Sequence, residues 1–181
     1  MPPSPLLLRP ATPADLPAMR DIHADAVPRG TGSFALDVPD APEFARRRDE
    51  VLARGLPWLA AERDGRVLGY AYASPFRARP AYRFCVEDSI YLDPRSRGAG
   101  VGRALLAEWL ARCQAAGARQ MLAVIGDSAN LGSIGVHRAL GFEPCGLLRS
   151  VGWKFGRWLD VVLMQRGLGV GAATAPVADG A

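Results

Sequence analysis

The chain has 181 residues, of which 49% are hydrophobic and 22% charged, a composition typical of one ordinary globular domain. A net charge of +4 is too weak to require nucleic acid, and three scattered cysteines with two histidines indicate neither a disulfide framework nor a metal site. No apolar run approaches the ~20 residues that span a bilayer, and the start lacks the basic region of a secretory signal, so we expect a cytoplasmic protein that binds no membrane.

Hydrophobic periodicity and turn residues predict a strand, two helices and a β-hairpin in the first half of the chain. Thr12 followed by Pro13 is typical of a helix start, and apolar residues then recur every three or four positions to about Ala26. A Gly- and Pro-rich loop is expected over 28–42, and Asp64-Gly65 is a hairpin-turn signal. The predicted elements are a strand at 6–9, helices at 13–26 and 41–54, and strands at 58–63 and 67–74.

The second half alternates strands with helices. Strands are predicted at 84–92, 120–125, 142–153 and 159–165, and helices from the glycine turn at 98–102 to about 116 and from the cap at 127–130 to about 140. Residues 167–181 are rich in Gly, Ala and Pro, and we expect them to form a disordered tail. The sequence therefore predicts a single mixed α/β domain over residues 1–166.

A glycine-rich turn between a strand and a helix is the most informative stretch of the sequence. Gly98, Gly100 and Gly102 follow the strand at 84–92, and such glycines allow a ligand to approach the backbone closely. The free N–H groups and the positive dipole of a helix start bind phosphate, and Arg95, Arg97 and Arg103 add charge there. The turn matches neither the P-loop nor the G-x-G-x-x-G dinucleotide pattern. The alternative is a turn that only joins a strand to a helix.

At this turn the chain resembles the GNAT superfamily of N-acetyltransferases. Arg97-x-x-Gly100-x-Gly102 matches the acetyl-CoA motif Q/R-x-x-G-x-G/A of that superfamily, and an Asn on the next helix, Asn130, matches its second signature. Four further strings resemble the phosphinothricin and methionine sulfoximine acetyltransferase branch, at residues 57–59, 69–71, 86–91 and 151–160. The resemblance covers about residues 6–166. It implies a GNAT fold, with a central mixed, mostly antiparallel twisted sheet flanked by helices.

The resemblance implies acetyl-CoA as the co-substrate, with no metal. The turn would hold the pyrophosphate, a backbone N–H freed by a bulge in the preceding strand would bind the thioester oxygen, and the second helix would contact the coenzyme arm. The residues that the resemblance assigns to the coenzyme are Ile90, Tyr91, Leu92, Arg97, Gly98, Ala99, Gly100, Val101, Gly102, Arg103, Asn130 and Ser133.

The resemblance assigns two catalytic residues. Glu87, on the strand before the turn, is the expected general base that takes a proton from the amine; the alternative is an ordinary strand carboxylate paired with an arginine. Asp88 should face the opposite side of the sheet. His137 has a pKa near neutrality and could protonate the departing thiolate, or it could be a packed helix residue that bonds a carbonyl.

The acceptor of this branch is a small amino acid with a polar sulfur or phosphorus side chain, and its anionic groups call for arginines. The candidate substrate residues are Phe34, Arg77, Arg79 and Tyr82, and an exposed arginine-rich loop is the alternative for the last three. Lys154 and Trp158 could line the same pocket or a dimer interface. Two other functions stay open: transfer to a protein N-terminus or another amine, and binding of acetyl-CoA without catalysis. By analogy with the branch we expect a homodimer.

Overall fold

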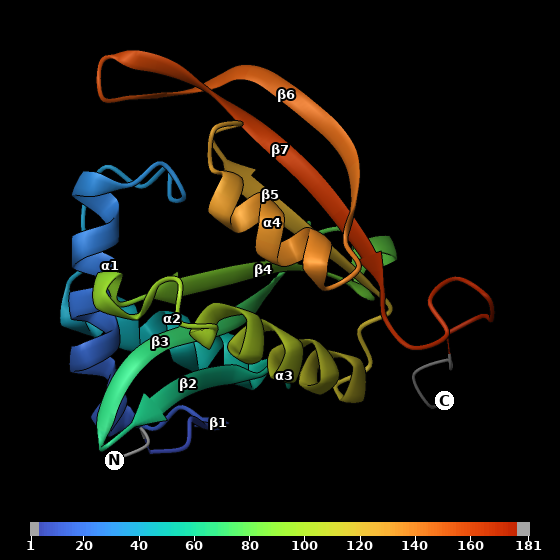
Figure 1. Cartoon of the computed structure of the whole chain (residues 1–181). Helices are drawn as coiled ribbons and strands as arrows, with labels where there is room; N and C mark the ends of the chain where they lie inside the picture. The colour runs from blue at the N-terminus through green and yellow to red at the C-terminus, as the bar shows by residue number, and fades with distance from the viewer. Residues whose placement is uncertain (1–3, 177–181) are drawn as a thin grey trace.

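The computed structural model describes residues 4–176 and contains one seven-stranded sheet with helices on both faces (Figure 1). The strand order is β1-β2-β3-β4-β5-β7-β6, and only β4 and β5 pair in parallel. The prediction of a mixed, mostly antiparallel sheet flanked by helices is therefore confirmed. The strands are β1 (Leu7–Pro10), β2 (Trp58–Arg63), β3 (Arg66–Pro75), β4 (Cys85–Leu92), β5 (Gln120–Gly126), β6 (Glu143–Lys154) and β7 (Arg157–Gly167).

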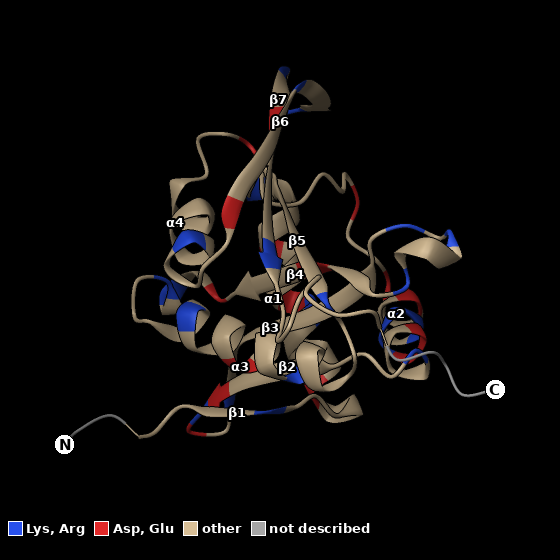
Figure 2. Ribbon diagram, turned by 90° about the vertical axis from the view of Figure 1, so that its right-hand side faces the viewer, with Lys and Arg blue, Asp and Glu red and all other residues tan. Residues whose placement is uncertain are grey.

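Four α-helices and three short 3-10 helices surround the sheet. The α-helices are α1 (Leu16–Arg29), α2 (Ala41–Ala53), α3 (Val101–Ala115) and α4 (Leu131–Ala139), and the 3-10 helices are η1 (Pro13–Asp15), η2 (Pro80–Tyr82) and η3 (Pro94–Ser96). Within residues 4–176, no helix is both long and apolar enough to cross a bilayer. On α2, Arg46 and Arg47 pair with Glu50 and Glu43, so both signs of charge mix along this helix (Figure 2).

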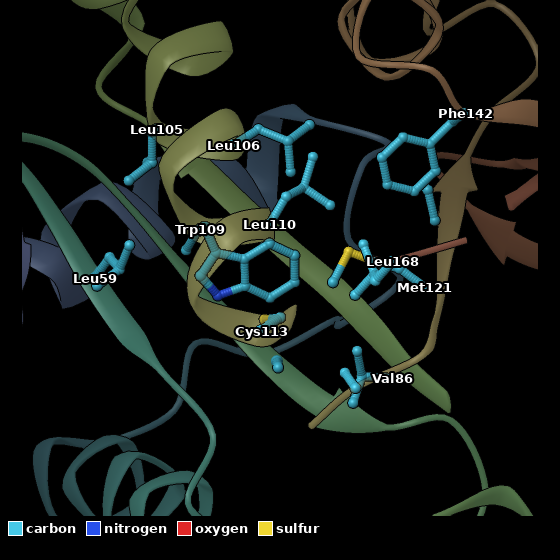
Figure 3. Packing of buried hydrophobic residues seen from close by; sticks show 14 of the residues in the cluster. Leu59, Val86, Leu105, Leu106, Trp109, Leu110, Cys113, Met121, Phe142 and Leu168 are labelled. Atoms are coloured by element: carbon cyan, nitrogen blue, oxygen red, sulfur yellow. The ribbon is translucent and has the colours of Figure 1, made fainter. Parts of the chain in front are cut away.

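Each face of the sheet has its own hydrophobic core because side chains alternate along a strand. On one face, α3 packs Leu105 and Trp109 against the strands, together with Met121 of β5 (Figure 3). On the other face, α1 and α2 enclose an aromatic cluster around Trp58 and Tyr70. The sheet thus separates a face covered by α3 from a face covered by α1 and α2.

The pairing between β4 and β5 is short, and this opens a gap in the sheet. The two strands pair only from Cys85↔Gln120 to Glu87↔Leu122. Beyond Glu87, β4 keeps β3 as its partner to Leu92, while β5 keeps β7 as its partner to Gly126. The facing edges of the two strands are therefore unpaired beyond this point. The expected bulge in β4 is not found, because its register with β3 continues without a shift from Val86 to Leu92.

Strands β6 and β7 form a long hairpin that extends beyond the rest of the sheet (Figure 1). β6 is the edge strand, and its residues from Glu143 to Val151 are exposed. Several large apolar side chains of the hairpin lie on the surface, among them Trp153 and Trp158, which are 57% and 60% exposed. The hairpin therefore presents an apolar edge that this chain alone does not cover.

Three boundaries differ from those predicted. The first helical turn is the 3-10 helix η1, where the backbone N–H of Thr12 donates to Asp15 at 2.7 Å. α1 continues to Arg29, past Pro28, where a loop was expected, because a proline in the last turn removes only one hydrogen bond. The tail expected to be disordered is in contact with the domain as far as residue 176: Leu168 is buried, and Arg119 donates to the carbonyl of Gly171. Residues 177–181 of that tail lie outside the described part.

Candidate active site

Glu87 lies at the closed end of the gap, at the last paired position between β4 and β5. Its carboxylate makes no hydrogen bond or ion pair within residues 4–176, so the arginine partner of the alternative interpretation is not present. Burial raises the pKa of Glu87, and the nearby charge of Asp88 raises it further. The gap thus contains a half-buried carboxyl group that holds a proton more readily than an ordinary glutamate.

Asp88 points to the opposite face of the sheet, as strand alternation predicted. Its Oδ2 lies 2.9 Å from Nε2 of His137, and the Asp88 and His137 side chains are 5% and 2% exposed. Nδ1 of His137 lies 2.7 Å from the carbonyl oxygen of Ser133 on the same helix. Because a carbonyl oxygen only accepts, Nδ1 carries a proton and donates it to Ser133.

The environment of His137 favours a charged ring. Burial alone lowers the pKa of His137, but the hydrogen bond and charge of Asp88, with the Ser133 carbonyl, outweigh burial and raise the pKa above 6.5. Both ring nitrogens then donate to protein oxygens, and neither is left for a thiolate. This geometry favours the alternative in which His137 is a packed helix residue that bonds a carbonyl.

The glycine turn opens α3 without a side-chain cap. Gly100 is the N-cap, with φ of 79°, and Gly98 has φ of 75°, a left-handed conformation that glycine adopts without strain. Nothing lies within 4 Å of where a Cβ would stand at either residue. Gly102 has a different role, because a Cβ there would lie 2.9 Å from Cδ1 of Leu92. Open space thus adjoins the backbone at the start of α3, while Gly102 keeps the helix close to β4.

The arginines near the turn fall into two groups. Arg95 pairs with Asp93, as does Arg66, and the hydrogen bond from Arg95 holds the pKa of Asp93 at about 2. Arg97 and Arg103 are exposed and form no ion pair within the described residues. Two of the predicted cations therefore remain available to a phosphate ligand beside the start of α3.

Asn130 and Ser133 both take part in the start of α4. The side-chain oxygen of Asn130 accepts from the N–H of Ser133 at 3.3 Å, so Asn130 is the N-cap of the helix. The Ser133 hydroxyl lies 3.4 Å from Nδ1 of His137. These contacts place both residues at the end of α4 that follows β5, beside the open end of the gap.

The predicted substrate residues are not brought together. Arg77, Arg79 and Tyr82 are exposed on the loop that joins β3 to β4, ahead of Glu87 on β4. Phe34 lies at the open end of the gap, because its ring packs against Gly126 at the end of β5. Since β4 and β5 run in parallel, the two groups lie on opposite sides of Glu87 along the strands.

Two contacts escaped the sequence analysis. Asp88 was assigned no role, although it pairs with His137, 49 residues away. Lys154, named only as a pocket or interface candidate, donates to the carbonyls of Gly30 and Ser33. No local spacing could reveal either contact, although Lys154 stands out as the only lysine in a chain with many arginines.

Comparison with known proteins shows the family of this chain. The pattern of the Acetyltransferase (GNAT) family matches residues 16–142, and the chain belongs to this family. It is 53% identical to phosphinothricin N-acetyltransferase of Alcaligenes faecalis over 90% of this chain and 82% of that protein. It is 40% identical to the L-methionine sulfoximine/L-methionine sulfone acetyltransferase of Pseudomonas aeruginosa, over 89% of this chain and 94% of that protein.

A solved structure extends the likeness to three dimensions. The crystal structure of a phosphinothricin acetyltransferase from Sinorhizobium meliloti in complex with acetyl-CoA superposes with a TM-score of 0.93. The two chains are 48% identical, and the match covers 96% of this chain and 94% of that one. The resemblance to the phosphinothricin and methionine sulfoximine acetyltransferases is therefore confirmed, and so is the expectation of an acetyltransferase enzyme.

Proposed function

We propose that this protein transfers the acetyl group of acetyl-CoA to the primary amine of a small amino acid of the phosphinothricin or methionine sulfoximine type. One observation carries the proposal: an unpaired, half-buried Glu87 closes a gap between β4 and β5 whose open end adjoins the uncapped start of α3. The likeness to enzymes named for these two acceptors supports the substrate class.

In this proposal the coenzyme lies between the two strands. Its pyrophosphate binds the backbone N–H groups from Gly98 to Arg103, with charge from Arg97 and Arg103. This range includes Ala99 and Val101. Further proposed contacts come from Asn130 and Ser133 at the start of α4. The arm then follows the unpaired edge of β4, where an N–H of Ile90, Tyr91 or Leu92 donates to the thioester oxygen.

The reaction proceeds by direct transfer. Glu87 takes a proton from the acceptor ammonium, directly or through a water, and the free amine attacks the thioester carbonyl carbon. The carbon–sulfur bond then breaks, and the thiolate is protonated by the proton that the attacking nitrogen releases or by solvent. His137 is not given this step, because both its ring nitrogens donate to Asp88 and Ser133.

The acceptor is a small molecule in this proposal, and its anionic groups are matched by the exposed arginines Arg77 and Arg79 with Tyr82. Because Phe34 lies on the other side of Glu87, we assign it to the opposite wall of the acceptor site. We also propose that the protein is a homodimer. The exposed apolar edge of β6 supports this, since an edge strand can pair with its own copy around a two-fold axis.

A coupled assay tests the proposal. Purified protein is mixed with acetyl-CoA and with phosphinothricin, methionine sulfoximine or a panel of peptides, and the release of free thiol is followed. We expect release with at least one of the two amino acids. Release of thiol with peptides alone would show that the acceptor is a peptide and not a small amino acid. Coenzyme binding without release of thiol on any amine would indicate a non-catalytic binding protein. Sedimentation of the same sample measures the proposed dimer.

A further inference from the structure

The segment of residues 30–34, between α1 and α2, crosses the open end of the gap. On the β4 side, burial raises the pKa of Tyr91 and the nearby Ser33 side chain opposes this rise, so Ser33 lies beside Tyr91. On the β5 side, a Cβ added to Gly126 would lie 2.1 Å from the carbonyl oxygen of Thr31 and 2.8 Å from the ring of Phe34. The segment therefore touches both diverging strands, on the face of the sheet that α1 and α2 cover.

Lys154 holds this segment from the end of β6. Its Nζ donates to the carbonyl of Gly30 at 3.0 Å and to that of Ser33 at 2.7 Å. The residue is 5% exposed, so its charge is removed from water and is stabilised by these two oxygens and by the ring of Phe155, whose centroid lies 5.0 Å from Nζ. The two carbonyls lie near the ends of the segment and more than 100 residues before Lys154 in the chain, so one ammonium fixes the segment to the hairpin.

Phe34 makes a second contact between the same two parts. A Cβ on Gly152, two residues before Lys154, would lie 2.2 Å from Cε2 of Phe34. Gly152 has no left-handed φ, so glycine is required here for space and not for backbone conformation. The ring of Phe34 thus packs against two glycines, Gly126 of β5 and Gly152 of β6, which both lie on the β5 side of the gap.

We propose that Lys154 is a positioning residue for the acceptor: its ammonium fixes residues 30–34 as the wall of the acceptor side of the gap. This inference rests on the proposed acetyltransferase function. The wall lies on the α1–α2 face, whereas α3, whose start would bind the coenzyme phosphates, packs on the other face. Loss of the ammonium should therefore affect acceptor binding and leave coenzyme binding intact.

The first test is Lys154→Met, which keeps the length of the side chain and removes its donors. We expect the KM for the amino-acid acceptor to rise about tenfold, from loss of charge-assisted hydrogen bonds, with KM for acetyl-CoA unchanged. Trypsin should also cut the native variant after Arg29 faster than the parent. Arg149→Met is the matched control, because Arg149 is an exposed cation on the same strand without a contact to the segment. This control should change neither the acceptor KM nor the rate of cleavage after Arg29.

The second variant, Gly152→Ala, displaces Phe34 and keeps Lys154. It should give the same selective rise in acceptor KM, and it keeps the test decisive if Lys154→Met does not fold. Equal changes in both KM values, or no change in acceptor KM in a folded variant, would overturn the proposal. If the parent protein acetylates neither amino acid, the proposed function fails; the tryptic comparison needs no substrate, and equal cleavage rates in parent and Lys154→Met would then overturn the anchor itself.

Discussion

Nε2 of His137 lies 2.9 Å from Oδ2 of Asp88, the residue that follows Glu87 on β4, and both side chains of the pair are almost fully buried. Because Asp88 and Glu87 are adjacent on a strand, they face opposite sides of the sheet. The pair thus fixes β4 against α4 at the very position where β4 leaves β5. It stabilises the strand that carries the proposed base without touching the acceptor side.

Removing the carboxylate of Glu87 should abolish most of the turnover. In Glu87→Gln we expect kcat to fall about 10²- to 10⁴-fold, the usual contribution of a general base. Affinity for coenzyme A, measured by calorimetry, should stay unchanged, because the glycine turn is untouched. Retention of full activity would show that the carboxylate is not the base.

The pH dependence of the reaction should report the raised pKa of Glu87. A general base works only when ionised, so kcat/KM for the acceptor should fall as the pH drops through the pKa of Glu87. Because burial and Asp88 raise this pKa, the fall should begin at a higher pH than an ordinary glutamate pKa of 4.5 allows. A pH profile of thiol release measures it, and the residual activity of Glu87→Gln should lack this acid limb.

Breaking the buried pair should destabilise the protein strongly. Asp88→Asn leaves His137 without its counter-ion, and loss of one partner of a buried pair costs about 3–5 kcal/mol. Urea unfolding of Asp88→Asn, with Glu87→Gln as the neighbouring control, measures the difference. A loss no larger in Asp88→Asn than in Glu87→Gln would contradict the burial argument.

The same pair predicts a pH dependence of stability. The pKa of His137 is raised in the folded protein, so its contribution to the free energy of unfolding is complete below the unfolded value of about 6.5 and is lost as the pH rises through the folded value. Unfolding of the parent and of His137→Phe at several pH values tests this. The stability difference between the two should shrink towards alkaline pH, and a difference that grows there would contradict a charged ring.

Gly100 should not tolerate a side chain. Gly100→Ala places a Cβ on a residue with φ of 79°, which costs about 1–2 kcal/mol in stability, and it should also weaken coenzyme binding. The matched control is Gly135→Ala in α4, where no atom lies within 4 Å of the new Cβ and φ is not left-handed. Alanine in that helix should stabilise by up to about 1 kcal/mol. Thermal unfolding and calorimetry of both variants check the opposite signs.

The sequence predicted the fold well because its elements are marked locally. The strand–glycine–helix junction, the turn at Asp64-Gly65 and the cap at Asn130 all depend on neighbouring residues. The resemblance to the GNAT superfamily then supplied the type of sheet, mixed and mostly antiparallel. Local signals failed where tertiary contacts determine the structure. Helix α1 continues past Pro28, and the segment after residue 167 packs against the domain through Arg119.

The candidate site was predicted less completely. Alternation along β4 correctly separated Glu87 from Asp88, but the partner of Asp88 comes from a helix 49 residues away. The gap itself arises from where the pairing of β4 with β5 ends, which no pattern within either strand encodes. The roles of Phe34 and Lys154 depend on packing between a loop and a distant hairpin.

The burial of Lys154 has a consequence for the chemistry of the surface. Acetyl-CoA acylates accessible ε-amino groups without any enzyme, and this chain keeps its only lysine out of water, engaged with two carbonyl oxygens. Elsewhere its positive side chains are guanidinium groups, which a thioester does not modify at neutral pH. The single ε-amino group of the folded protein is therefore shielded from this side reaction.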